Sequence, residues 1–154
     1  MCLLTSRKRG WITAKDIVCY KVLYEKNEEY FTPYMYRRVN ENVISGKYSF
    51  HDDTASVSVI YPSRNVFSEK NSNRFLTGAG FIHSFKGLRS AKQLCYDLSL
   101  RHSNNYVVYK CIIPAGTRYY KGKDEYLDVH AYAAEKIKFV EEVYRLNYEE
   151  RIKT

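Results

Sequence analysis

The segment that most constrains the fold runs from residue 81 to residue 113, where two apolar runs flank an amphipathic one. Residues 106–113, YVVYKCII, are almost continuously aromatic, β-branched or aliphatic, which is typical of a strand buried on both faces at the centre of a sheet. Residues 81–85, FIHSF, have the composition of a second, shorter strand. Between them, apolar side chains recur every three or four residues and predict a helix over about 90–101, with Ser90 as its N-cap.

Further strands are expected on both sides of this unit. Residues 17–24, IVCYKVLY, form the second long apolar run and predict another central strand. Residues 55–61 alternate as a half-buried strand does, and residues 136–144 predict a late strand. The helix between the strands at 81–85 and 106–113 makes a connection long enough for those two strands to lie parallel in one sheet. We therefore expect an α+β fold, with a mixed, twisted sheet of roughly five to seven strands and one principal helix.

The polar segments predict loops and ends. Residues 31–39 contain Pro33 and are expected to be an edge strand or a loop. Residues 62–77 are the longest polar stretch and predict a functional or mobile loop, and 130–135 predict a short helical turn or a loop. At 154 residues we expect a single domain. We expect an N-terminal arm over residues 1–15, the α+β domain over 16–144 and a charged tail over 145–154.

The composition bears on partners and location. Lys and Arg number 25 against 17 Asp and Glu, so the formal charge of +8 favours either an anionic partner or a solvated basic surface. The 16 tyrosines can stack on bases or fill the core. No apolar run approaches the ~20 residues of a membrane span. In the N-terminal sequence MCLLTSRKRGW the charge follows the apolar residues, the reverse of a signal peptide, so we expect a cytoplasmic protein.

Neither cysteine nor histidine spacing indicates a metal. The four cysteines, at positions 2, 19, 95 and 111, match no zinc pattern, and three of them lie in apolar segments where a free thiol behaves as a small hydrophobic group. The histidines at 51, 83, 102 and 130 include no pair at helical spacing. No phosphate-binding glycine motif is present. We expect neither a metal nor a cofactor.

A few polar side chains are candidates for ligand binding. His83 lies in the middle of an apolar strand, where it is either a hydrogen-bonded core histidine or a cleft-facing donor or base. Lys21 follows Tyr20 in the first long strand and either points to solvent or lines a cleft. Beyond the Pro114–Gly116 turn, a basic and aromatic cluster would suit a phosphate and a base. Its members are Arg118, Tyr119 and Lys121.

The order of three segments resembles a set of small uncharacterised proteins from gut bacteria and their phages. The segments are GFIHSFKGLRSAKQLCY, YVVYKCIIPAGTRYYKG and HAYAAEKIKFVEE, and the resemblance covers most of residues 17–143. It implies no particular activity.

More distantly, the same order is similar to small ADP-ribosyltransferase-like domains such as rifampin-modifying enzymes. Those enzymes use a His or Arg on the first strand, a Tyr on a later strand and a late acidic residue, whereas the first long strand here carries Tyr20 and Lys21. The nearest equivalents in this chain are His83, Tyr34 and Glu135. The resemblance implies NAD as substrate, in a cleft lined by Tyr20, Lys21, His83 and Tyr119, with Glu135 stabilising the charge that develops on the ribose.

Three functions follow as hypotheses. The first is a non-catalytic protein that binds an anionic, nucleotide-like ligand or a host macromolecule. It fits the basic charge, the tyrosine content and the lack of a complete catalytic constellation. The alternatives are an ADP-ribosyltransferase-like enzyme that uses NAD and a nucleic-acid-binding protein. The sequence gives no indication of oligomeric state.

Overall fold

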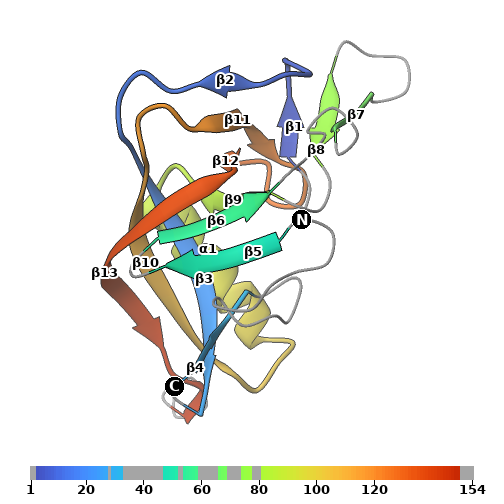
Figure 1. Ribbon diagram of the computed structural model, residues 1–154. Coiled ribbons are helices and arrows are strands. Elements are labelled where there is room, and N and C mark those ends of the chain that lie inside the picture. The colour runs from blue at the N-terminus through green and yellow to red at the C-terminus, as the bar shows by residue number, and fades with distance from the viewer. Residues whose placement is uncertain are drawn as a thin grey trace.

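The computed structural model describes residues 3–27, 29–32, 47–51, 54–58, 66–68, 74–77 and 81–149. In this part of the chain, 13 strands form one curved sheet and a single helix, α1 (Leu88–Ser99), packs on it (Figure 1). The strands are β1 (Leu3–Thr5), β2 (Trp11–Ile12), β3 (Ile17–Lys26), β4 (Glu29–Phe31), β5 (Lys47–His51), β6 (Thr54–Ser58), β7 (Val66–Ser68), β8 (Phe75–Thr77), β9 (Ile82–Phe85), β10 (Asn105–Ile113), β11 (Arg118–Asp124), β12 (His130–Ala134) and β13 (Lys136–Leu146).

The expectation of an α+β fold with a mixed sheet is wrong. The strand order is β5-β6-β13-β10-β3-β9-β12-β11-β1-β8-β7, with β2 on β11 and β4 on β3, and every strand pair in the described residues is antiparallel. The reason is the position of β3. Strands β9 and β10 run parallel to each other across α1, as expected of a crossover, but β3 lies between them and pairs with both. The molecule is a large antiparallel sheet with one helix.

The central elements form where the apolar pattern predicted them. Strand β10 carries fully buried residues on both faces, including Val107 and Val108, because α1 covers one face and the curved sheet covers the other. Helix α1 buries the stripe of Ala91, Leu94 and Leu98. Its N-cap is Gly87 rather than the expected Ser90, and no side chain caps it.

Segments expected to be irregular or helical are strands. Of residues 130–135, expected as a helical turn or loop, all but the last form β12, whose Ala131, Ala133 and Ala134 are fully buried. The polar stretch 62–77 includes β7 and β8. Residues 3–12, expected in the arm, form β1 and β2, and Arg145 and Leu146, expected in the tail, complete β13.

Some expectations lie outside the described residues. They concern Cys2, the segment that contains Pro33 and Tyr34, and residues 59–61 of the expected strand. No helix in the described ranges is long and apolar enough to span a membrane.

The two faces of the sheet carry separate apolar clusters. One cluster includes Val22, Phe85, Leu94 and Tyr106 and packs around α1. The other, on the opposite face, includes Leu23, Ile82, Val107 and Ile137 and is enclosed by the curvature of the sheet (Figure 1). Since successive strand residues point to opposite faces, this division determines where each candidate side chain lies.

Gly122 allows a close approach of two strands and provides a stability test. A Cβ at this position would overlap the main-chain carbonyl oxygen of Leu4 on β1. We predict that Gly122→Ala lowers the free energy of unfolding by about 1–3 kcal/mol, measured by urea denaturation, because β1 must move away from β11. The control is Gly87→Ala, whose added Cβ has open space and is expected to cost at most about 1 kcal/mol. Equal losses in both variants would contradict the close approach.

Candidate functional site

The residues expected to bind a ligand do not share one cleft. On β3, Lys21 lies on the sheet face of Cys19 and Leu23, whereas Tyr20 lies on the opposite face with the cluster around α1. Adjacent residues of a strand necessarily diverge in this way. Tyr20 and Lys21 therefore cannot line the same pocket.

Lys21 is buried in the interior of the sheet. Its side chain is 6% exposed, and its Nζ donates a hydrogen bond of 2.8 Å to the main-chain carbonyl of His83. Burial lowers the pKa of Lys21 to about 8. Cys19 and Cys111 are register partners on the neighbouring strands β3 and β10, and they interact electrostatically with this amine. Burial raises the pKa of Cys19 to about 11, so the thiol is protonated and unreactive at neutral pH.

His83 is a buried, fully hydrogen-bonded histidine. Its Nδ1 lies 3.1 Å from the Phe81 carbonyl, which can only accept, so Nδ1 carries the proton. Its Nε2 then accepts from the hydroxyl of Thr77 at 3.3 Å, and that hydroxyl accepts in turn from the main-chain N–H of Leu3. Burial, followed by the charge of Lys21, lowers the pKa of His83 to about 3. Of the two alternatives for His83, the geometry is that of the core histidine, which links β1, β8 and β9.

The remaining candidates gather on the outer part of the sheet. Strand β2 pairs with β11 so that Trp11 lies opposite Tyr119, and their ring centroids are 6.1 Å apart. The guanidinium of Arg7 and the ammonium of Lys121 lie 5.1 Å and 5.0 Å from the centre of the Trp11 ring. Arg118 approaches Glu135, with 3.8 Å between Nε and Oε1. We call Arg7, Trp11 and Lys121 the Trp11 surface, in which the two cations are exposed and the indole ring is half-buried.

A basic turn, residues 7–10, adjoins the Trp11 surface, and hydrogen bonds from side chains of β11 fix its main chain. The N–H of Gly10 bonds to the carbonyl of Arg7, and Gly10 has a φ of 66°, a conformation that favours glycine. The hydroxyl of Tyr120 donates to the carbonyl of Lys8 at 3.0 Å, and the guanidinium of Arg118 donates to the carbonyl of Arg9. The exposed side chains of residues 7–9 therefore project from a fixed main chain.

Glu135 is the carboxylate of this neighbourhood. It follows β12 directly and is half-buried, and burial raises its pKa while the charge of Arg118 opposes the rise. The structure thus pairs Arg118 with Glu135, whereas Tyr119 and Lys121 lie with Trp11 on the other face of β11. It places Lys21 and His83 in the interior.

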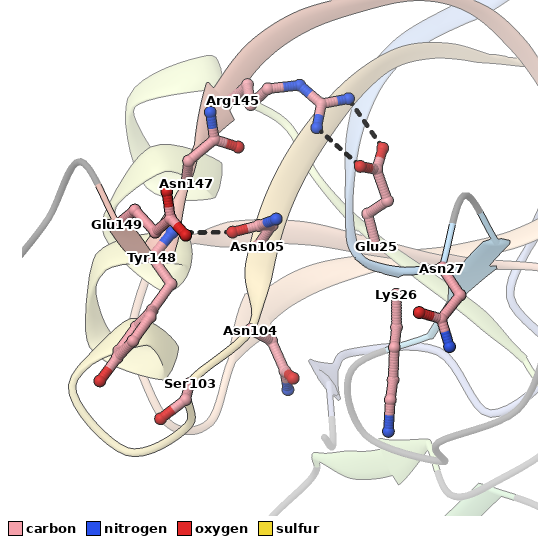
Figure 2. Close-up of a pocket in the computed structure, with 10 residues that line it drawn as sticks. All are labelled: Glu25, Lys26, Asn27, Ser103, Asn104, Asn105, Arg145, Asn147, Tyr148 and Glu149. Atoms are coloured by element: carbon pink, nitrogen blue, oxygen red, sulfur yellow. Dashed lines mark hydrogen bonds and ion pairs between the residues drawn. The ribbon is translucent and has the colours of Figure 1, made fainter.

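Sequence reasoning missed a polar cleft at the end of the central strands, with a volume of about 710 Å³. Its walls come from the end of β3, the start of β10 and the segment after β13 (Figure 2). At its rim, Arg145 forms a bidentate ion pair with Glu25, at 3.0 and 2.8 Å, and also bonds to Glu142 at 2.6 Å. Residues 103–105, Ser-Asn-Asn, have the composition of a turn. The signal in the sequence was the pair of adjacent amides, Asn104 and Asn105. The residues that complete the cleft lie about 80 positions earlier and about 40 positions later, so the sequence alone does not bring them together.

Within the described part of the chain, no group of three or more His, Cys, Asp or Glu side chains could hold a metal ion. Cys19, Cys95 and Cys111 are free and buried, which confirms the expectation for these three residues. No protein-family model, curated protein or solved structure matches this chain significantly. The resemblances drawn from the sequence therefore remain expectations.

The burial of His83 predicts acid sensitivity. Unfolding exposes the ring, which then binds a proton below its ordinary pKa of 6.5, whereas the folded protein resists protonation down to about 3. The unfolded state binds more protons in this window, so stability falls as the pH is lowered from 6.5, by about 1.4 kcal/mol per pH unit. Urea unfolding between pH 7 and pH 4.5 should show this slope. Glutamates, with an ordinary pKa of 4.5, titrate in the lower part of this window, so the slope due to His83 is read above about pH 5.5.

His83→Gln should remove the slope, whatever its effect on the absolute stability. His130→Gln is the matched control, because His130 is exposed on β12. An unchanged slope in His83→Gln would show that another group is responsible.

Proposed function

We propose that the protein binds an anionic, nucleotide-like ligand at the Trp11 surface without transforming it. The observation that carries the proposal is the arrangement of two cations about one indole ring. Arg7 and Lys121 both lie about 5 Å from the ring centre of Trp11. A phosphate can contact such cations, and the half-buried ring of Trp11 beside them can contact a base.

The charge balance of the Trp11 surface supports an anion as ligand. Arg7, Lys8, Arg9 and Lys121 are exposed, and no described carboxylate forms a salt bridge with them. Arg118 is compensated by Glu135, at 3.8 Å. Uncompensated cations on a fixed main chain raise the local concentration of an anion and lose little entropy on binding it.

The placement of the reactive groups supports binding rather than turnover. His83 and Lys21, the residues most suited to acid-base chemistry, are buried away from the Trp11 surface and are hydrogen-bonded to the main chain. The ADP-ribosyltransferase-like activity implied by the resemblance would have to depend on Glu135, which is engaged with Arg118. It remains a prediction.

The single tryptophan of the chain allows a direct test. We expect ADP, ATP and NAD to change the fluorescence of Trp11 saturably, with an affinity that falls as salt is added. Arg7→Gln combined with Lys121→Gln should weaken binding at least about tenfold, because two charge-assisted contacts to phosphate are lost. The control is Lys86→Gln combined with Arg89→Gln, which removes the same charge from exposed positions beside α1.

Three results would count against the proposal. They are equal affinity in the two double variants, no fluorescence change with any nucleotide, and release of nicotinamide from NAD that is abolished by Glu135→Gln. The last would favour the enzyme. Much tighter binding of a single-stranded oligonucleotide than of mononucleotides, with a steep salt dependence, would favour the nucleic-acid-binding alternative.

A further inference from the structure

The cleft at the end of β3, β10 and β13 concentrates one kind of side chain. All four asparagines in the described part of the chain line it, namely Asn27, Asn104, Asn105 and Asn147. The other lining residues are Glu25, Lys26, Ser103, Arg145, Tyr148 and Glu149, so no aliphatic side chain contributes. Small-molecule pockets of similar volume are usually lined by apolar groups. This lining therefore disfavours a hydrophobic ligand.

The charges of the cleft disfavour an anion as well. All three nitrogens of the Arg145 guanidinium donate to the carboxylates of Glu25 or Glu142. These bonds lower the pKa of Glu25, so the pair stays ionised. The lining holds two carboxylates and two cations in total, so its formal charges cancel. Because every nitrogen of its arginine already bonds to a carboxylate, the cleft offers little attraction to a phosphate.

The polar groups of the cleft are held in defined positions. The Oδ1 of Asn105 accepts from the main-chain N–H of Tyr148 at 2.8 Å, which joins the segment after β13 to the start of β10 (Figure 2). Asn27 has a left-handed main chain, with a φ of 53°. Figure 2 shows Tyr148 and Ser103 on one side, Lys26 and Asn27 on the other, and Asn104 between them.

A side-chain amide offers a donor and an acceptor side by side, and a carboxylate accepts two hydrogen bonds. This combination matches neighbouring hydroxyl groups, each of which donates and accepts. The ring of Tyr148 adds an apolar surface with a polar tip. We propose that this cleft binds a neutral saccharide through its amide side chains. None of the residues of the Trp11 surface lines it, so the inference is independent of nucleotide binding.

The test is chemical-shift mapping of the whole protein with maltotriose, cellotriose and chitotriose as probes, each at millimolar concentration. At least one should shift amide signals of residues 25–27, 103–105 and 145–149 saturably. Asn104→Ala removes one amide. Asn27→Gly removes a second while keeping the left-handed conformation accessible. Each variant should bind the same sugar roughly five- to tenfold more weakly, since one or two hydrogen bonds are lost.

The matched control is Gln93→Ala, which removes an exposed amide on α1 that bonds only to Asp97. It should leave sugar binding unchanged. The proposal is overturned if none of the three sugars shifts the signals of the cleft. It is also overturned if Asn104→Ala and Asn27→Gly bind as the unsubstituted protein does, or if ADP shifts the same signals more strongly than any sugar.

Discussion

The position of β3 between β9 and β10 is the constraint on which the rest of the sheet depends. Strands β9 and β10 are joined through α1 and run in the same direction, so a strand that pairs with both must be antiparallel to both. β3 fills this position. It lies in the middle of the sheet, with nine residues in register with β10, and its side chains from Val22 to Tyr24 are buried in the two apolar clusters. A lysine at position 21 then has no route to solvent and must find its hydrogen-bond acceptor inside, as it does at the carbonyl of His83.

The strongest local patterns were sufficient to predict β3, β9, β10, β13 and the approximate extent of α1, because a central strand and an amphipathic helix leave a clear apolar signature. The fold class was not predictable in the same way. Strands β9 and β10 could have paired directly or with a third strand between them. The outcome depends on β3, a segment that lies some 60 residues before β9. β12 is the sharpest case. His130–Ala134 is rich in alanine, which favours helix, but all three of its alanines are fully buried in a strand between β9 and β11.

The candidate site residues, like the elements of the fold, were predictable only where the evidence lay within one short segment. That Tyr20 and Lys21 point to opposite faces follows from strand geometry and was within reach of the sequence. The environment of His83 was not, because its partner Thr77 belongs to a different strand. The grouping of Arg118, Tyr119 and Lys121 as a basic and aromatic cluster followed from one short segment. Their neighbours Arg7 and Trp11 precede them by more than a hundred residues, and only the pairing of β2 with β11 brings the two segments together.

The two proposed sites differ in how their cations are compensated, and this difference matters more than the net charge of the chain. At the cleft, Arg145 is bonded through every nitrogen to carboxylates, so an incoming phosphate would have to displace strong charge-assisted bonds. At the Trp11 surface, the described partner of Arg7 and Lys121 is an indole ring. Both cations are exposed, and a cation–π contact at an exposed site is worth only about 0.5–1 kcal/mol. A phosphate can therefore recruit both exposed cations at little cost. On this ground we propose anions as ligands of the Trp11 surface and neutral polar ligands for the cleft, in one chain of net charge +8.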